Sequence, residues 1–188
     1  MKKTNFNALR DRAYRNAVKH GFHDKKHSPY HYLMLVVTEL GEAVEADRNG
    51  NYAQRRMFEY IYDTPQVNPD SHWMFCFETF IKDTVEDELA DAAIRLFDFA
   101  GSMNLDIHDH YFTEGNYSCF SKIFLNRSFP DILYRVVLSL DYDNYYNPSA
   151  TLLYLFAIAY HLGFDLQWHI EQKMKYNEMR HYKHGKKF

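Results

Sequence analysis

The chain has little of several things that mark other classes of protein. Its two cysteines, Cys76 and Cys119, lack the spacing of a zinc ligand set or a redox pair, so we expect a reducing, cytoplasmic setting. A net charge of −3 gives no electrostatic footprint for nucleic acid. The most apolar segment, residues 152–162, is too short to cross a bilayer, and no apolar run follows the first residues as in a signal peptide. We therefore expect no membrane partner.

Glycine is also scarce, with seven residues, whereas aromatic residues make up 18% of the chain. This balance predicts a bulky interior with few tight turns, and we find no alternation typical of strands. The fold is therefore predicted to be all-α, with residues 51–70 mixed because prolines would break a helix there. Helices are expected from Phe6 to His20, Ser28-Pro29 to Asn49-Gly50, His72 or Phe80 to Ala100 (ended by Gly101), Pro130 to Leu140, Ser149 to Leu162, and from about Asp165 onward.

Two acidic pairs stand out inside apolar helical patterns, Glu39 with Glu42 and Glu88 with Asp91. Residues three apart lie on one face of a helix, so each pair would present two carboxylates together. Two such helices side by side would gather four carboxylates at one point, which is strongly unfavourable unless cations neutralise them. Mg²⁺ takes oxygen ligands of this kind and also binds phosphate oxygens. The pairs therefore predict a metal site for phosphate chemistry.

Acidic pairs also occur on ordinary solvated helix faces, where they bind nothing. A basic complement near the C-terminus favours the metal site: Lys173, Asn177 and Arg180 recur at helical spacing and would share one face. Such a face suits phosphate oxygens. The alternative is that cations near a helix C-terminus only complement the helix dipole.

Together these motifs resemble the all-α nucleoside triphosphate pyrophosphohydrolases of the MazG type, which include dimeric dUTPases and a dCTP pyrophosphatase. The family pattern is E-x-x-E on one helix, E-x-x-D on the next long helix and K-x-x-x-N-x-x-R on a C-terminal helix. The segment His27-Ser28-Pro29 also looks like the H-x-P that opens the first acidic helix in the dCTP-hydrolysing branch. The chain departs from the pattern at Thr38, where a second Glu is usual, and in a longer stretch between the acidic pairs. The preferred base therefore stays open.

The resemblance implies one MazG-like helical bundle over residues 1–188 that hydrolyses an NTP or dNTP to the monophosphate and pyrophosphate. It implies Mg²⁺, with Mn²⁺ as a possible substitute, and a homodimer or dimer of dimers. The implied metal ligands are Glu39, Glu42, Glu88 and Asp91, and one glutamate of the first pair, Glu39 in preference to Glu42, would act as general base. The implied substrate-binding residues are Lys173, Asn177, Arg180 and His27. Independently of the resemblance, Arg95 lies one turn past Asp91 on the same face, so it could reach a phosphate or pair with Asp98.

An extra helical segment, at about residues 108–165, is predicted to be an insertion into this bundle. Leu96-Phe97 and Ala100 recur as Leu155-Phe156 and Ala159, but Asn147 and Ala150 stand where the acidic pair would be. We expect the helix from Ser149 to Leu162 to lie against the end of the second acidic helix. The acids of the segment should be solvated and without a catalytic role: Glu114, Asp131, Asp141 and Asp143. Chance similarity between two buried helices is the alternative.

Other classes of protein stay open. A ferritin-like di-metal carboxylate protein would also place acids in a bundle, but it uses Glu-x-x-His pairs, for which only Glu178/His181 fits. A non-catalytic helical interaction protein would carry the acidic pairs as ordinary surface. The dipeptides His23-Asp24 and His108-Asp109 could belong to an HD-type phosphohydrolase, although neither lies in an apolar helix.

Overall fold

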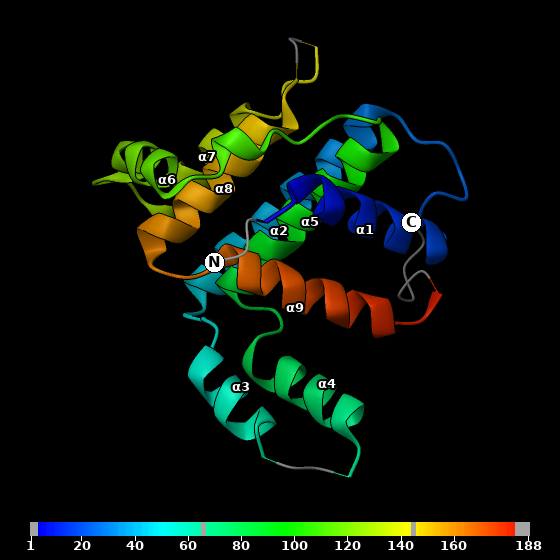
Figure 1. The fold of residues 1–188 in the computed structure, drawn as a ribbon. Coiled ribbons are helices and arrows are strands. Elements are labelled where there is room, and N and C mark those ends of the chain that lie inside the picture. Colours follow the sequence, from blue (N-terminus) through cyan, green and yellow to red (C-terminus); the bar gives the residue numbers. More distant parts are fainter. Residues whose placement is uncertain (1–3, 65–66, 144–145, 183–188) are drawn as a thin grey trace.

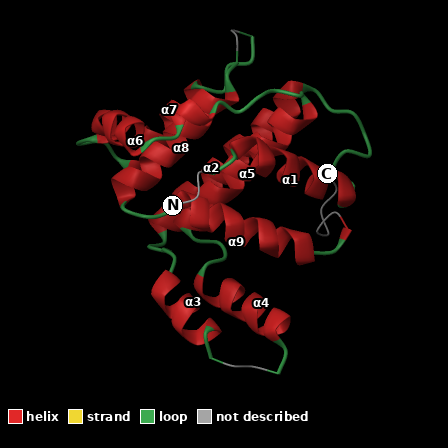
Figure 2. Ribbon diagram, in the orientation of Figure 1, coloured by secondary structure: helices red, strands yellow, loops and turns green. Residues whose placement is uncertain are grey.

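The computed structural model describes residues 4–64, 67–143 and 146–182. These residues form helices and turns without a strand, as the sequence predicted (Figure 2). The elements, in chain order, are α1 (Phe6–Lys19), α2 (Pro29–Arg48), α3 (Arg55–Tyr62), α4 (Pro69–Phe80), α5 (Val85–Ser102), η1 (Asp109–Tyr111), α6 (Glu114–Ser121), η2 (Lys122–Phe124), α7 (Phe129–Leu138), α8 (Pro148–Leu162) and α9 (Leu166–Met179). None of these helices alone has the length and apolar composition needed to cross a bilayer; α8 and α9 pass that test only as a pair, with a bend of 113° between them.

Capping residues explain where the predicted helices begin. The Ser28 side chain caps α2, and Pro29 follows at the first helical position, where its missing N–H costs nothing. Asp165 caps α9 by accepting a hydrogen bond from the Trp168 backbone N–H at 3.1 Å. The helices α1, α2, α7, α8 and α9 therefore lie within a few residues of their predicted positions.

The predicted long acidic helix is instead two helices. Thr84 begins α5 by accepting a hydrogen bond from the Asp87 backbone N–H at 3.3 Å, and Asp83 before it has a left-handed φ of 60°. Pro69 does not break a helix, because it opens α4 at a first-turn position. Gly101 does not end the acidic helix but lies inside it, and α3 and α6 are helices that the sequence analysis missed.

The central helix of the bundle is α5, against which α1, α2, α8 and α9 all pack (Figure 1). Its alanines and leucines, among them Ala90, Ala92, Ala93 and Leu96, are buried in the main core. Because neighbours cover it on several sides, α5 also brings polar side chains into the interior. Those side chains form the candidate site described below.

The helices α3 and α4 form a hairpin that projects from the bundle, at the bottom of Figure 1. Its buried aromatic residues, Phe58, Trp73 and Phe77, belong to a second, smaller core. Tyr176 of α9 completes this core, and its ring stacks on that of Phe77 at 4.7 Å between centroids. The hairpin is thus attached to the same helix that carries the predicted basic motif.

The segment predicted as an insertion contains α6, α7 and α8, which pack together beside the bundle (Figure 1). α8 contacts α5 as expected, and the Tyr146 ring just before α8 meets the Phe99 ring near the end of α5 at 5.6 Å. The acids Glu114, Asp131, Asp141 and Asp143 are exposed, in line with the prediction that they are solvated. Whether the segment was inserted into an older bundle stays a prediction.

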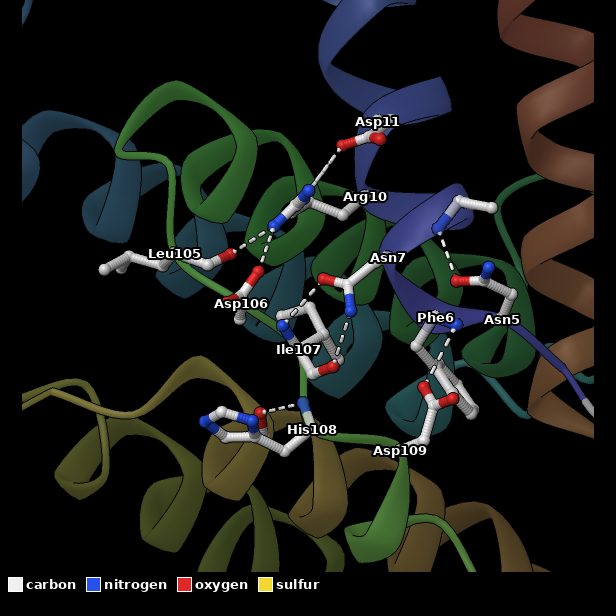
Figure 3. A network of polar contacts seen from close by, with 12 residues as sticks. Asn5, Phe6, Asn7, Arg10, Asp11, Leu105, Asp106, Ile107, His108 and Asp109 are labelled. Atoms are coloured by element: carbon white, nitrogen blue, oxygen red, sulfur yellow. Dashed lines mark hydrogen bonds and ion pairs between the residues drawn. The ribbon is translucent and has the colours of Figure 1, made fainter.

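A polar network ties the start of α1 to the segment that follows α5 (Figure 3). The Asn7 side chain donates to the Ile107 carbonyl and accepts from the Ile107 N–H, both at 2.9 Å. Arg10 donates to the Leu105 carbonyl at 2.9 Å, and the His108 N–H donates to Ser149 Oγ of α8 at 2.9 Å. These contacts fix the N-terminal end of α1 over α5 and connect both to α8.

The close contact of α1 with α5 gives a testable prediction at Gly101. A Cβ on Gly101 would lie 2.5 Å from Tyr14 Cβ, which cannot rotate away. Gly101→Ala should therefore lower the free energy of unfolding by roughly 1–3 kcal/mol, although alanine is the better helix former. Denaturant unfolding followed by circular dichroism measures the change.

Gly41 in α2 is the matched control for that substitution, because a Cβ there would meet nothing within 4 Å. Gly41→Ala should raise the free energy of unfolding by about 0.5–1 kcal/mol. If both substitutions stabilise the protein, the close packing of α1 on α5 is wrong.

Candidate metal and phosphate site

The two predicted acidic pairs lie together, because α2 and α5 pack side by side. Glu39, Glu42 and Glu88 can each offer one carboxylate oxygen such that the three atoms lie within 4.8 Å of one another. Burial is the largest cause that raises the pKa of Glu39 and Glu88, and the charge of Asp91, one turn beyond Glu88, raises both further. The structure thus brings three of the predicted ligands together and places the fourth close enough for its charge to act on two of them.

Glu88 is a buried carboxylate that the protein leaves without a hydrogen bond on one oxygen. The residue is 4% exposed, and its Oε2 atom is fully buried with no partner among the described residues. Burial, followed by the charge of Asp91, raises the pKa of Glu88 to about 9. A buried, unpaired carboxylate is costly, and a proton or a cation would remove the cost. The donor set therefore fits a hard divalent cation.

Arg95 of α5 pairs with Glu39 and not with Asp98. Its Nε atom donates to Glu39 Oε1 at 2.9 Å, and Glu39 is 4% exposed. Burial and Asp91 raise the pKa of Glu39, whereas Arg95 lowers it. The Glu39 carboxylate thus both pairs with Arg95 and belongs to the group with Glu42 and Glu88.

Lys173 of α9 enters the interior and meets two carboxylates of α5. Its Nζ atom lies 2.5 Å from Asp87 Oδ2 and 2.9 Å from Asp91 Oδ2, and the residue is 4% exposed. Burial opposes the charge on Lys173, yet Asp91 and Asp87 raise its pKa above the ordinary value. The ammonium that the sequence assigned to phosphate thus neutralises an aspartate pair in this structure.

Asp87 is a residue of this site that the sequence analysis missed. It is fully buried, and burial raises its pKa to about 6 although Lys173 pulls in the opposite direction. The signal was present, because Asp87 precedes Asp91 by one helical turn inside an apolar pattern. Asp87 also groups with Asp83 and Glu88 within 4.8 Å. In that second group Lys82 and Lys173 already neutralise both aspartates, so the first group is the better cation site.

Asn177 and Arg180 lie at a pocket next to Asp91, which α1, α5 and α9 enclose. The pocket is lined by Ala13, Asn16, Ala17, Phe22, Asp91, Ile94, Arg95, Asp98, Asn177 and Arg180. Three predicted substrate-binding residues therefore share one pocket with a predicted metal ligand. His27 does not line it; its ring stacks on His31 at 4.0 Å, in the segment where α2 begins.

A histidine–aspartate pair at this pocket, formed by the partly buried His23 and the buried Asp98, was also missed. His23 Nε2 and Asp98 Oδ1 are 2.7 Å apart, and Tyr32 Oη lies 3.1 Å from His23 Nδ1. His23 thus contacts Asp98 across the fold and not its neighbour Asp24 in an HD-type arrangement. Burial raises the pKa of Asp98, and the hydrogen bond from His23 opposes the rise.

Comparison with known proteins gives no relative on which to base an assignment. No protein-family model, no curated protein and no solved structure matches the chain. The resemblance to MazG-type enzymes therefore depends on the three short motifs, and the geometry of the site has to carry any functional argument.

The buried ion triad gives a prediction for stability. Lys173→Met should lower the free energy of unfolding by about 3–5 kcal/mol, because it leaves Asp87 and Asp91 without their cation in the interior. Adding Asp87→Asn to that variant should recover much of the loss. Urea unfolding of the single and double variants measures the coupling.

Lys175 is the control for this prediction, since it lies on the same helix but outside the triad, with its Nζ atom 4.2 Å from the Trp73 ring centroid. Lys175→Met should cost about 1 kcal/mol or less. A loss at Lys173 no larger than that at Lys175 would contradict the triad.

The raised pKa of Glu88 predicts how the metal-free protein responds to pH. Between its ordinary value of 4.5 and about 9, the folded protein holds a proton on Glu88 that the unfolded chain has released. Stability of the metal-free protein should therefore fall as pH rises through that window. Thermal unfolding at a series of pH values measures the slope.

Glu88→Gln should flatten this pH dependence, and Mg²⁺ should weaken it in the unchanged protein because the cation replaces the proton. An identical slope in the unchanged protein and in Glu88→Gln would show that Glu88 does not titrate in this range.

Proposed function

We propose that the chain is a Mg²⁺-dependent nucleoside triphosphate pyrophosphohydrolase, releasing a nucleoside monophosphate and pyrophosphate. The observation that carries the proposal is the approach of Glu39, Glu42 and Glu88 to within 4.8 Å, with an oxygen of Glu88 left unpaired. A pocket with Arg95, Asn177 and Arg180 adjoins that group through Asp91. Phosphoryl transfer requires acids that bind a metal and, beside them, cations that bind phosphates.

The residues that would hold Mg²⁺ are Glu39, Glu42, Glu88 and Asp91. Once bound, the ion would neutralise phosphate charge and lower the pKa of a coordinated water. Asp91 is held by Lys173 through one oxygen, which fixes the orientation of its carboxylate. Glu39 is held in the same way by Arg95, so two of the four ligands are positioned before any substrate arrives.

The remaining roles follow from charge and exposure. Arg180 and Asn177 offer a guanidinium and an amide at the pocket, and both suit phosphate oxygens. Glu39 is the candidate general base, because its carboxylate lies beside the other acids. Burial raises its pKa, and the charge of and hydrogen bond from Arg95 oppose the rise. Lys173 acts in this proposal through Asp91.

The competing classes have less support. The acid groups that could hold a metal in the described part of the chain contain carboxylates alone, whereas the di-metal carboxylate proteins add histidine ligands. Glu178, the glutamate of the only Glu-x-x-His pair, is engaged by Arg12 at 2.6 Å. A purely structural protein gives no reason for a carboxylate buried without a partner. The predicted homodimer or dimer of dimers stays part of the proposal.

The test is a panel of NTPs and dNTPs with and without Mg²⁺, assayed separately for pyrophosphate and for phosphate. Pyrophosphate should be released only with Mg²⁺ or Mn²⁺. Glu39→Gln, Glu42→Gln, Glu88→Gln and Asp91→Asn should each lower kcat/KM on the order of a hundredfold or more, since each removes a metal ligand. Glu114→Gln, at an exposed acid of α6, is the control and should leave activity unchanged.

Three outcomes would contradict the proposal in different ways. Phosphate without pyrophosphate would overturn the position of attack. Full activity in one of the four variants would remove that residue from the site. Absence of Mg²⁺-dependent nucleotide binding in calorimetry would favour a non-catalytic protein, and bound iron with oxidase activity would favour the di-metal class.

A further inference from the structure

The pocket beside Asp91 is lined by both charged and apolar side chains. Asp91, Arg95 and Arg180 supply the charged part of the lining, and the two arginines would attract phosphates. Ala13 and Ala17 of α1, together with Phe22, supply small apolar side chains and an aromatic ring. A nucleotide offers matching surfaces, with charge at its phosphates and flat, weakly polar faces at its base.

Asn16 stands among these apolar residues with an unused acceptor. Its side-chain Oδ1 atom is fully buried and has no hydrogen-bond partner among the described residues. The backbone carbonyl of Asn16 is satisfied, since it accepts the His20 N–H at 3.0 Å. An orphaned amide oxygen costs free energy in the free protein, and a ligand N–H would remove that cost.

Asp98 is a second acceptor at the pocket. Its Oδ1 atom lies 2.7 Å from His23 Nε2. An amide oxygen and a carboxylate repel phosphate and attract N–H donors. A ligand group that binds against these two acceptors therefore has to present N–H groups and not carbonyl oxygens.

We propose that the α1 side of the pocket binds an amino-bearing nucleobase and that Asn16 Oδ1 accepts one of its N–H groups. This inference rests on the proposed function and names the part of the substrate that α1 recognises. Cytosine, adenine and guanine carry an exocyclic amine on the edge they use for pairing. Uracil and thymine present there one N–H between two carbonyl oxygens, which would face the acceptors of the pocket. The pocket therefore selects against uracil and thymine.

Binding of nucleoside monophosphates tests this assignment without requiring hydrolysis. Calorimetry with CMP, AMP, GMP, UMP and TMP in the presence of Mg²⁺, using the full chain, should give tighter binding of at least one amino-bearing monophosphate than of UMP and TMP. Asn16→Ala should weaken the preferred monophosphate about tenfold, the expected loss for one buried hydrogen bond. Inorganic tripolyphosphate, which has no base, should bind both proteins equally.

Asn16→Ala should also leave the free protein as stable as before or more stable, because it removes an unpaired buried atom and adds a good helix former. A variant that is stable and yet binds the base less well separates recognition from folding. A second variant, Ala17→Leu, should block the monophosphate by filling the pocket. Its matched control is Ala8→Leu on the exposed face of α1, which should bind normally.

The inference is overturned if the preferred monophosphate binds unchanged in both Asn16→Ala and Ala17→Leu, or if UMP binds as tightly as every amino-bearing monophosphate. Pyrophosphate release from NTPs would in that case still stand. If monophosphates bind with the expected dependence on Asn16 but no triphosphate is hydrolysed, the base pocket is correct and the proposed reaction is wrong.

Discussion

Charge compensation inside the bundle governs how α2, α5 and α9 come together. The central helix α5 carries Asp87, Glu88, Asp91 and Asp98 into the interior, and each would be costly there without a partner. Lys173 meets the first and third from α9, and His23 meets the last. This fold thus places a basic side chain beside three of the four carboxylates.

This compensation is incomplete, and the shortfall is located at one place. The buried Oε2 atom of Glu88 has no hydrogen-bond partner among the described residues. Arg95, the partner of Glu39, also interacts with the charges of Asp91 and Asp98. A protein selected for stability alone would place an apolar side chain at position 88. In the proposed function, Mg²⁺ would supply the positive charge that this part of the interior lacks.

The sequence predicted the parts that depend on local pattern. Helices α1, α2, α7, α8 and α9 followed from apolar periodicity and from start signals such as Ser28-Pro29, and the approach of the two acidic pairs followed from their spacing. The break before α5 was missed because Thr84 was not recognised as a cap. The helix α3 was missed because it is short and its apolar face packs only against α4 and α9.

The parts that depend on partners distant in sequence could not be predicted. Lys173 was assigned to phosphate because its spacing shows only the face it shares with Asn177, and nothing local indicates that Asp87 and Asp91 lie opposite. His23 reaches Asp98 across the fold, and Asn16 is conspicuous only once its oxygen is seen to be unpaired. One sequence contains no record of such contacts.

The close packing of Tyr14 against Gly101 determines how near α1 lies to α5 at that point. The N-terminal end of α1 is tied down at Asn7 and Arg10, whereas Ala13, Asn16 and Ala17 at the pocket lie around and beyond the contact at Tyr14. A side chain at position 101 would push α1 away from α5 at Tyr14. Because α1 is a rigid helix, the displacement would extend to the residues at the pocket. Position 101 does not line the pocket, yet a substitution there is expected to change the pocket by moving the helix that carries Ala13, Asn16 and Ala17.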